Sequence, residues 1–195
     1  MLFKATDYEP LKNYLNSLAK LNEAEWAAFE AILSLKSFKR KEVFQPPGKI
    51  CDIVGFILRG CFRSVKDHDG EERTFSFATE HEFITNYYSI LTQKPSVVSI
   101  VAVEPSIVIC APATQVMALF DSSIAWQKIG RHLAEQSVCF YSERLLTSFY
   151  ETPRVRYDHL MATAPELFLR IPHHILANYL GMTKETLSRL RNPLK

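Results

Sequence analysis

A stretch of 29 residues, from Ser122 to Tyr150, contains no proline and a single glycine, Gly130. Its apolar residues recur at alternating intervals of three and four, which is the periodicity of a helix that packs along another helix. Such a helix would be about 40 Å long, which is more than a small strand-rich domain can cover. The stretch therefore predicts either an amphipathic helix packed on its own core or a dimerisation helix. The residues assigned to the dimer interface are Ile129, Leu133, Gln136 and Phe140, and a second stripe, which faces elsewhere, consists of Val138, Tyr141, Leu145 and Phe149.

The region before this helix, from about residue 39 to residue 121, has the pattern of short strands. Apolar runs rich in β-branched residues alternate with turn signals such as Pro46-Pro47-Gly48, and the Asp69-Gly70 pair is typical of a β-hairpin turn. Strands at this spacing indicate a sandwich or a barrel rather than a parallel sheet with crossover helices. Neither a GxGxxG nor a GxxxxGK[ST] motif occurs, so a phosphate-binding loop for nucleotides is not indicated.

The composition narrows the class of protein. The chain has 195 residues, of which 47% are hydrophobic, and this suits one packed domain with a small appendage. It has no run of about 18 uncharged apolar residues, and Lys4, Asp7 and Glu9 interrupt its first segment, so we expect neither a membrane span nor a signal peptide. The four cysteines form no CxxC pair, which argues against a zinc or iron–sulfur site. A cytoplasmic protein with reduced thiols is the expectation.

The C-terminal segment HHILANYLGMTKETLSRLRNPLK predicts two short helices joined by a tight turn. The first helix is expected at about residues 173–180, after which Gly181 can adopt the left-handed backbone conformation that a sharp turn needs. Thr183 is a good N-cap for the second helix, and the small side chain of Ala177 lets the two helices approach closely. This spacing is typical of a helix-turn-helix, whose second helix lies in the major groove of DNA. The alternative is an ordinary helical hairpin.

The outward face of the second helix carries side chains that suit contact with DNA. Arg and Lys donate hydrogen bonds to guanine O6 and N7, and Glu accepts one from the amino group of cytosine. Thr183, Thr186 and Arg191 are better placed for phosphate groups. The residues assigned to the DNA contact are Thr183, Lys184, Glu185, Thr186, Ser188, Arg189 and Arg191.

The net charge of +2 is unevenly distributed along the chain. Residues 169–195 contain five basic residues and one acidic residue, a net charge of +4, while the remainder has 18 basic and 20 acidic residues, a net charge of −2. A basic end on a slightly acidic body favours DNA as the partner, with an affinity that depends strongly on salt.

The segment LGMTKETLSRLR resembles the helix-turn-helix of the Crp–Fnr transcription regulators, the family of the cyclic-AMP receptor and fumarate–nitrate reduction regulators. Glu185, Ser188 and Arg189 match the E-x-x-S/G-R pattern of the recognition helix in that family. The segments GFILRGCFRSV and DGEERTFSFATEHEFI are similar to its cyclic-nucleotide-binding barrel. The resemblance implies an α+β fold with an N-terminal β-barrel or jelly roll, a long dimerisation helix and a small C-terminal winged helix-turn-helix. It further implies a homodimer that binds inverted repeats in double-stranded DNA, with RNA polymerase as a further partner.

The resemblance also divides the chain into three parts. They are a sensor domain with N-terminal helices at residues 1–121, a dimerisation helix and linker at 122–150, and a DNA-binding domain at 151–195. Within the last part, residues 154–164 are expected to form a helix and the segment ELFLRIP a short strand-like step. Because only four residues follow Arg191, we expect no strands after the recognition helix and hence a minimal winged domain.

The chain departs from the family pattern at the cyclic-nucleotide pocket. The family has a Glu for the ribose hydroxyl and an Arg for the phosphate, but no Glu lies between Phe83 and Pro95, and Ser96 stands at the position of the Arg. A cyclic phosphate buried without that cation would lose a charge-assisted contact worth about 1.5–3 kcal/mol, so we expect no tight binding of cyclic AMP. The residues that either line a pocket for an unknown small-molecule effector or merely fill it are Phe83, Asn86, Tyr87, Tyr88 and Ser96. The N-terminal cysteine cluster of the iron–sulfur branch is missing, since the first cysteine is Cys51, and no cofactor is expected.

Two other functions are compatible with parts of the sequence. One is a ligand-binding sensor that acts through protein partners without DNA, which would show no salt-dependent DNA binding. The other is a barrel enzyme of the cupin type, which needs clustered metal ligands, whereas the strand region offers only His68 and His81. We therefore expect no catalytic residues, no metal site and no enzyme activity, and transcription regulation is the favoured function.

Overall fold

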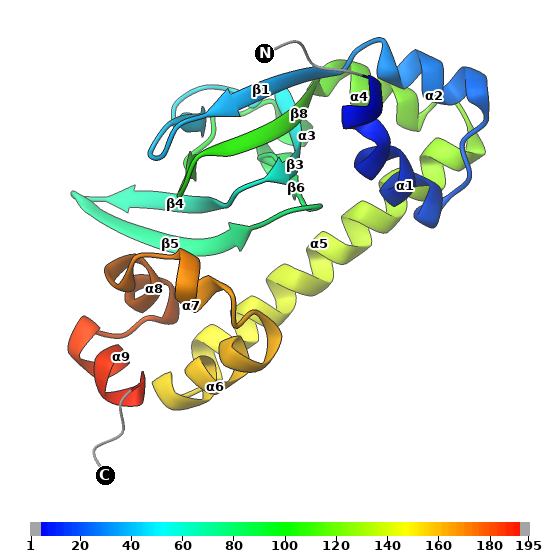
Figure 1. Ribbon diagram of the computed structural model, residues 1–195. Helices are drawn as coiled ribbons and strands as arrows, with labels where there is room; N and C mark the ends of the chain where they lie inside the picture. Colours follow the sequence, from blue (N-terminus) through cyan, green and yellow to red (C-terminus); the bar gives the residue numbers. More distant parts are fainter. Residues whose placement is uncertain (1–4, 192–195) are drawn as a thin grey trace.

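Two four-stranded antiparallel sheets face each other and form a jelly-roll sandwich with helices on both outer faces (Figure 1). The computed structural model describes residues 5–191. Sheet A has the strand order β1-β8-β3-β6 and sheet B has the order β2-β7-β4-β5. The strands are β1 (Ser34–Phe38), β2 (Val43–Gln45), β3 (Ile53–Arg59), β4 (Phe62–His68), β5 (Glu71–Ala78), β6 (Phe83–Ile84), β7 (Ser99–Ala102) and β8 (Ser106–Pro112).

The sheets are not joined into a closed barrel, which corrects the barrel alternative of the predicted fold. β1 and β6 are the edges of sheet A, β2 and β5 are the edges of sheet B, and no strand pairing connects the two sheets within residues 5–191. Pro46 and Pro47 directly follow β2 and have no amide hydrogen with which to extend its ladder. The jelly-roll alternative, an α+β sandwich, is confirmed.

The hairpin predicted from Asp69-Gly70 is present between β4 and β5, with His68 opposite Glu71. Asp69 and Gly70 have φ angles of 55° and 83°, which is the left-handed region that a tight two-residue hairpin turn requires. Glycine and Asp adopt this region more readily than other residues do, so the dipeptide sets the position of the turn.

The space between the two sheets is filled by apolar side chains. Its buried members are Phe44, Ile57, Phe62, Ile84, Ile100, Ala102, Val108 and Cys110. The ring centroids of Phe38, Phe44 and Phe62 lie between 5.5 and 6.0 Å from one another. At Gly55 a Cβ would lie 2.7 Å from Cγ1 of Val108, so even one more methyl group would not fit there. The interior of the sandwich is therefore a packed core.

Helices from both ends of the strand region cover the outer face of sheet A. They are η1 (Ala5–Tyr8), α1 (Glu9–Leu18), α2 (Glu23–Glu30), α4 (Ala113–Phe120) and the first turns of α5 (Ile124–Tyr150), whereas α3 (Tyr87–Thr92) follows β6. A capping box starts α2: the side chain of Asn22 accepts a hydrogen bond from the amide of Glu25, whose carboxylate accepts one from the amide of Asn22. Trp126 and Ile129 of α5 are buried in the same apolar cluster as Phe29 of α2. This cluster attaches α5 to the sandwich.

The long helix predicted from the proline-free stretch is confirmed as α5, with 27 residues. Ser123 is its N-cap and accepts a hydrogen bond from the amide of Trp126. The helix continues from the sandwich to the C-terminal helices, where Glu151 leaves the helical conformation (Figure 1).

Four further helices form what we call the C-terminal unit, which packs on the outer face of sheet B (Figure 1). They are α6 (Pro153–Thr163), α7 (Leu167–Arg170), α8 (His173–Leu180) and α9 (Lys184–Arg191). The strand-like step predicted for ELFLRIP is wrong, because this segment forms α7. Its buried residues are Leu167, Phe168 and Ile171, at helical spacing, while Leu169 is 86% exposed, so the alternation of a strand is absent.

Within residues 5–191, no helix has both the length and the apolar character needed to cross a membrane.

Candidate nucleic-acid interface

The turn between α8 and α9 has the geometry that the sequence predicts. Gly181 adopts φ 66° and ψ 40°, the left-handed conformation, and the amide of Met182 donates to the carbonyl of Ala177 at 3.0 Å. The hydroxyl oxygen of Thr183 accepts a hydrogen bond from the amide of Thr186 at 3.2 Å, as an N-cap does. We call α8 and α9, with this turn, the helix pair.

A shared apolar core holds the helix pair together. Leu176, Ala177 and Leu180 of α8 and Leu187 of α9 are all 1% exposed or less and belong to one cluster. The methyl side chain of Ala177 leaves room for α9 to lie close against α8. The two helices therefore move as one body, and whatever fixes α8 also fixes α9.

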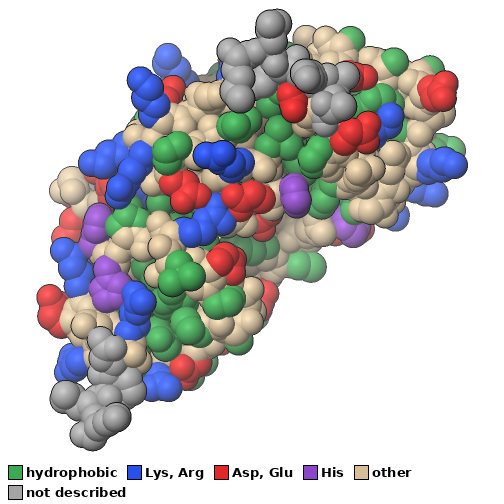
Figure 2. All heavy atoms as spheres, viewed as in Figure 1, with side chains coloured by type: hydrophobic (Ala, Val, Ile, Leu, Met, Phe, Trp, Pro, Cys, Tyr) green, Lys and Arg blue, Asp and Glu red, His purple; other side chains and the backbone are tan. Residues whose placement is uncertain are grey.

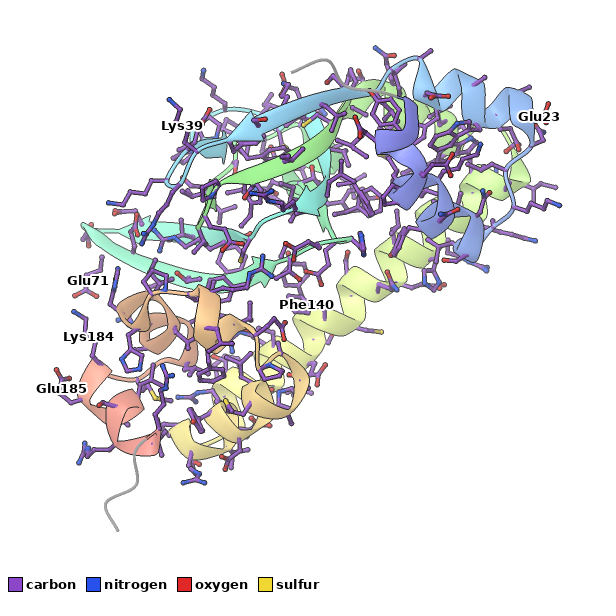
Figure 3. The ribbon with its side chains drawn as sticks, viewed as in Figure 1. Glu23, Lys39, Glu71, Phe140, Lys184 and Glu185 are labelled. Atoms are coloured by element: carbon purple, nitrogen blue, oxygen red, sulfur yellow. The ribbon has the colours of Figure 1, made fainter. Side chains whose placement is uncertain are left out.

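The residues assigned to the DNA contact lie on α9 or at its N-cap. Thr183, Lys184, Glu185, Ser188, Arg189 and Arg191 are exposed, and Thr186 is half-buried. Lys184 and Glu185 project from the start of α9 into solvent, on the same side of the molecule as Glu71 at the tip of the β4–β5 hairpin (Figure 3). Hydrogen bonds from its own backbone amide and from Thr183 lower the pKa of Glu185, so this carboxylate is ionised at neutral pH and acts as an acceptor.

Arg170, one of the five basic residues of the C-terminal end, points toward the sandwich. Its Nη1 donates to Oε2 of Glu80 at 2.8 Å, its Nη2 to Oε1 of Glu80 at 2.9 Å, and its Nε to Oε1 of Glu104 at 3.1 Å. Acidic and basic side chains lie side by side at this boundary between the sandwich and the C-terminal unit (Figure 2). The free cations of the helix pair are thus Lys184, Arg189 and Arg191.

Asn178 of α8 completes the edge of sheet B. The amide of Thr74 in β5 donates to Oδ1 of Asn178 at 2.7 Å, and Nδ2 of Asn178 donates to the carbonyl of Glu72 at 2.8 Å. Since β5 is an edge strand, its outward amide and carbonyl groups would otherwise be left to water. The carboxamide takes the place of a peptide group of a neighbouring strand.

Tyr179 is held between the sandwich and α5. Its ring centroid lies 4.9 Å from that of Phe77 in β5, and the guanidinium of Arg144 in α5 lies 4.0 Å from the centre of the same ring. The side chain of Arg156 in α6 donates to the carbonyls of Leu180 and Glu151 at 2.7 Å each. The contacts of Arg170, Asn178, Tyr179 and Arg156 were not predicted, because no local sequence pattern indicates a partner so distant in the chain.

One feature of the sequence could have indicated the Arg170 contact. Arg170 is a single charged residue within an apolar run, which suggests a buried partner of opposite charge.

Two of the five residues assigned to a ligand pocket, Asn86 and Ser96, are hydrogen-bonded to each other, and the assignment of the five to a pocket stays a prediction. Phe83 packs on the outer face of sheet A, with its ring 5.7 Å from Tyr14 and 5.1 Å from Phe56. Ser96 is 3% exposed, accepts from Nδ2 of Asn86 at 2.6 Å and donates to the carbonyl of Val98 at 2.6 Å. Asn86 is the N-cap of α3, while Tyr87 is half-buried and Tyr88 is exposed.

Residues 35–123, which span the sandwich from β1 to α4, match the model of the cyclic nucleotide-binding domain family. Residues 35–123 are therefore similar to cyclic nucleotide-binding domains, and this part of the chain is called the cyclic nucleotide-binding domain below. The division of the chain into a sensor domain, a dimerisation helix and a DNA-binding domain stays a prediction.

Solved structures extend the likeness beyond this domain to the C-terminal unit. FixK2 from Bradyrhizobium japonicum is 16% identical, with 84% of each chain covered and a TM-score of 0.73. A transcriptional regulator of the Crp/Fnr family from Eubacterium rectale is 16% identical, with 91% of this chain and 85% of that chain covered and a TM-score of 0.70. The catabolite activator protein from Thermus thermophilus is 20% identical, with 93% and 86% covered and a TM-score of 0.56. At these identities the likeness shows a shared fold, so the resemblance to Crp–Fnr regulators is confirmed at that level. No curated protein is similar enough in sequence to count as a match.

The residues assigned to the dimer interface lie on the face of α5 that turns toward the protein's own cyclic nucleotide-binding domain and its N-terminal helices. Ile129 is fully buried there, Leu133 packs against the same cluster, and Gln136 accepts a hydrogen bond from the hydroxyl of Tyr14 at 3.3 Å. Ile129 thus has no exposed surface in this chain, and the assignment of these residues to a dimer interface stays a prediction. Phe140 lies further along this face, turned toward the sheets, and is 41% exposed (Figure 3).

The second stripe of α5 lies on the opposite side of the helix. Val138 follows Ile129 by nine residues, which is two and a half helical turns. Tyr141, Leu145 and Phe149 continue the stripe, and all four residues are at least half exposed. One face of the helix thus packs on its own chain, and the other is an apolar surface open to solvent. The dimerisation helix stays a prediction.

A surface cavity of about 470 Å³ lies at one end of the cyclic nucleotide-binding domain, outside the sandwich interior. Its lining consists of Ser37, Phe38, Lys39, Glu42, Arg59, Pro105, Ser106 and Ile107. None of the residues assigned to the ligand pocket contributes to it. Among residues 5–191 there is no group of three or more His, Cys, Asp or Glu side chains arranged to hold a metal ion.

The contact between Arg170 and Glu80 makes the stability of the fold depend on pH. Burial alone would raise the pKa of Glu80, but hydrogen bonds from Arg170 and from the amide of Gly60 outweigh it and lower the pKa from 4.5 to about 2. Because the folded protein then binds the proton less tightly than the unfolded chain, ionised Glu80 stabilises the fold above pH 4.5, and this contribution is lost as the pH falls toward 2. Denaturant midpoints followed by circular dichroism should therefore fall more steeply over this range for the wild type than for Glu80→Gln. If the denaturant midpoint changes with pH in the same way in both proteins, ionised Glu80 does not stabilise the fold.

Proposed function

We propose that this protein is a DNA-binding transcription regulator of the Crp–Fnr type, which binds inverted repeats as a homodimer and does not respond to cyclic AMP. The observation that carries the proposal is the helix pair, whose second helix is fixed by a glycine turn and an N-cap while its charged face stays in solvent. The fold shared with a Crp/Fnr regulator over 91% of the chain supports it.

The exposed face of α9 has the chemistry of a base-reading surface. Arg189 presents a guanidinium whose planar donors suit guanine O6 and N7, and Lys184 can donate to the same atoms as a point charge. The ionised carboxylate of Glu185 suits the amino group of cytosine. Three cations and one carboxylate, a net charge of +2, supply a modest attraction to phosphate groups, which two copies of the helix would double.

We infer that the second copy binds along the exposed stripe of α5. Val138, Tyr141, Leu145 and Phe149 form a continuous apolar row, and a lone chain leaves them in water. Two such helices packed along this row would bury it and place both helix pairs at the same end of the dimer, as binding to one duplex requires. The stripe replaces the predicted interface, whose first half is occupied by the N-terminal helices.

The sensor domain is proposed not to bind cyclic AMP. Ser96 stands where the resemblance places an arginine, its hydroxyl is already bonded to Asn86 and Val98, and the space between the sheets is packed. A cyclic phosphate would meet no cation there and would have to displace buried rings.

Titration calorimetry with cyclic AMP should accordingly show no binding at micromolar concentrations. The loss of a charge-assisted contact of about 1.5–3 kcal/mol lowers affinity by about one to two orders of magnitude, before the cost of opening the core is added. A dissociation constant in the micromolar range or below would overturn this part of the proposal.

Selection of bound DNA from a random pool should return an inverted repeat with half-sites about 10 base pairs apart, centre to centre. Arg189→Ala should then reduce discrimination against a changed base in the half-site by about 1–3 kcal/mol. Arg131→Ala is the matched control, because Arg131 lies on α5 in an exposed pair with Glu135 and away from α9.

Binding curves of both variants and the wild type at two salt concentrations test the assignment. If Arg189→Ala binds the selected site as tightly and as selectively as the control, the proposal that α9 recognises DNA bases is wrong. If the wild type shows no salt-dependent binding to any DNA, the alternative function is favoured, a ligand-binding sensor that acts through protein partners without DNA.

The dimer surface is tested by Leu145→Glu, which places a charge in the middle of the exposed stripe. Sedimentation at micromolar protein concentrations should show a dimer for the wild type and a monomer for this variant, because two opposed carboxylates would have to lose their hydration. Phe140→Glu, on the other face of the same helix, is the control and should remain a dimer. The reverse result would restore the interface predicted from the sequence.

A further inference from the structure

The C-terminal unit is fastened to the cyclic nucleotide-binding domain by three kinds of contact. Cys61, just before β4, and Val103, just after β7, belong to the same buried apolar cluster as Leu176 and Leu187 of the helix pair. Arg170 bridges two carboxylates, and Asn178 pairs with the backbone of β5. An apolar contact alone permits sliding, whereas the polar contacts define one position.

The two carboxylates that hold Arg170 belong to well-fixed parts of the sandwich. Glu80 follows β5, and its Oε1 also accepts a hydrogen bond from the amide of Gly60, between β3 and β4, at 2.7 Å. Glu104 lies in the short link between β7 and β8. The bidentate arrangement of Arg170 with Glu80 restricts the angle of the guanidinium as well as its distance.

The position of α9 follows from these contacts. Arg170 is separated from the start of α8 by two residues, and Asn178 lies on α8 itself. Ala177 and Leu180 pack in one buried cluster with Leu187 of α9, so α8 cannot rotate against sheet B without carrying α9 with it. At the same time the charged face of α9 stays exposed, so the attachment leaves it accessible.

We propose that Arg170 and Asn178 are positioning residues for DNA recognition, which hold α9 in one orientation on sheet B and thereby set the half-site spacing that the dimer accepts. This inference rests on the proposed function.

The attachment is tested first without DNA, by amide hydrogen exchange. The amide of Thr74 is bonded to Asn178, and the amide of Gly60 is bonded to Glu80. Asn178→Ala and Arg170→Gln should each increase exchange at Thr74 by about tenfold or more, because the protecting contact is lost or opens more often. Arg154→Gln is the matched control, since Arg154 makes an exposed pair with Asp158 in the same unit, and it should leave Thr74 protected.

The second measurement uses the selected inverted repeat with one or two base pairs added to or removed from its centre. The wild type and Arg154→Gln should bind the original spacing at least tenfold more tightly than the altered ones. Arg170→Gln and Asn178→Ala should bind the original site more weakly and lose most of this preference for spacing, while the preference for the half-site bases is retained. A change that merely weakened the fold would lower binding to all spacings equally.

The outcomes separate the two proposals. Unchanged exchange at Thr74 in both variants, or unchanged spacing preference in both, overturns the positioning role even if the wild type binds DNA. A wild type that binds no DNA overturns the proposed function, whatever the exchange result. Asn178→Ala removes one surface side chain only, so the test remains decisive if Arg170→Gln fails to fold.

Discussion

The outer face of sheet A is apolar, sheet B has an apolar patch at Cys61, Phe77 and Val103, and an apolar surface must be covered by another layer. The N-terminal helices, α4 and the start of α5 cover sheet A, and the C-terminal unit covers sheet B. Because the two covers lie on opposite sides, the chain needs a long connection between them, and α5 is that connection. The position of the helix pair is thus a consequence of how the sandwich is shielded from water.

The polar contacts across this boundary contribute position more than stability. Removing Arg170, Glu80 and Glu104 from water has a cost that cancels part of their attraction, so the cluster stabilises the fold by less than its contacts alone suggest. Its geometry, however, admits one arrangement of donors and acceptors. The apolar cluster of Cys61, Val103 and Leu176 supplies the driving force, and the charged groups select the angle.

The packed interior of the sandwich supports the proposal that this domain does not bind cyclic AMP. A domain that binds a cyclic nucleotide between its sheets needs space and a positive charge for the phosphate. This domain has aromatic rings between its sheets, and the hydroxyl of Ser96 is already hydrogen-bonded within the protein. The domain acts as a platform: it holds one end of α5 on sheet A and the helix pair on sheet B. This role depends on rigidity, which the packed core provides.

Local features were predictable from the sequence because their causes lie within a few residues of each other. The absence of proline and the capping serine determine α5, Asp69-Gly70 determines the hairpin, and Gly181 with Thr183 determines the turn of the helix pair. The tertiary structure alone decided which face of α5 is buried, since both of its stripes are apolar and the packing of α1, α2 and α4 against one of them distinguishes them. It also decided that ELFLRIP is helical and that Arg170 faces Glu80, 90 residues away, rather than DNA. A charge or an apolar side chain has no fixed partner until the fold brings one within reach, and that distance is not encoded in any local pattern.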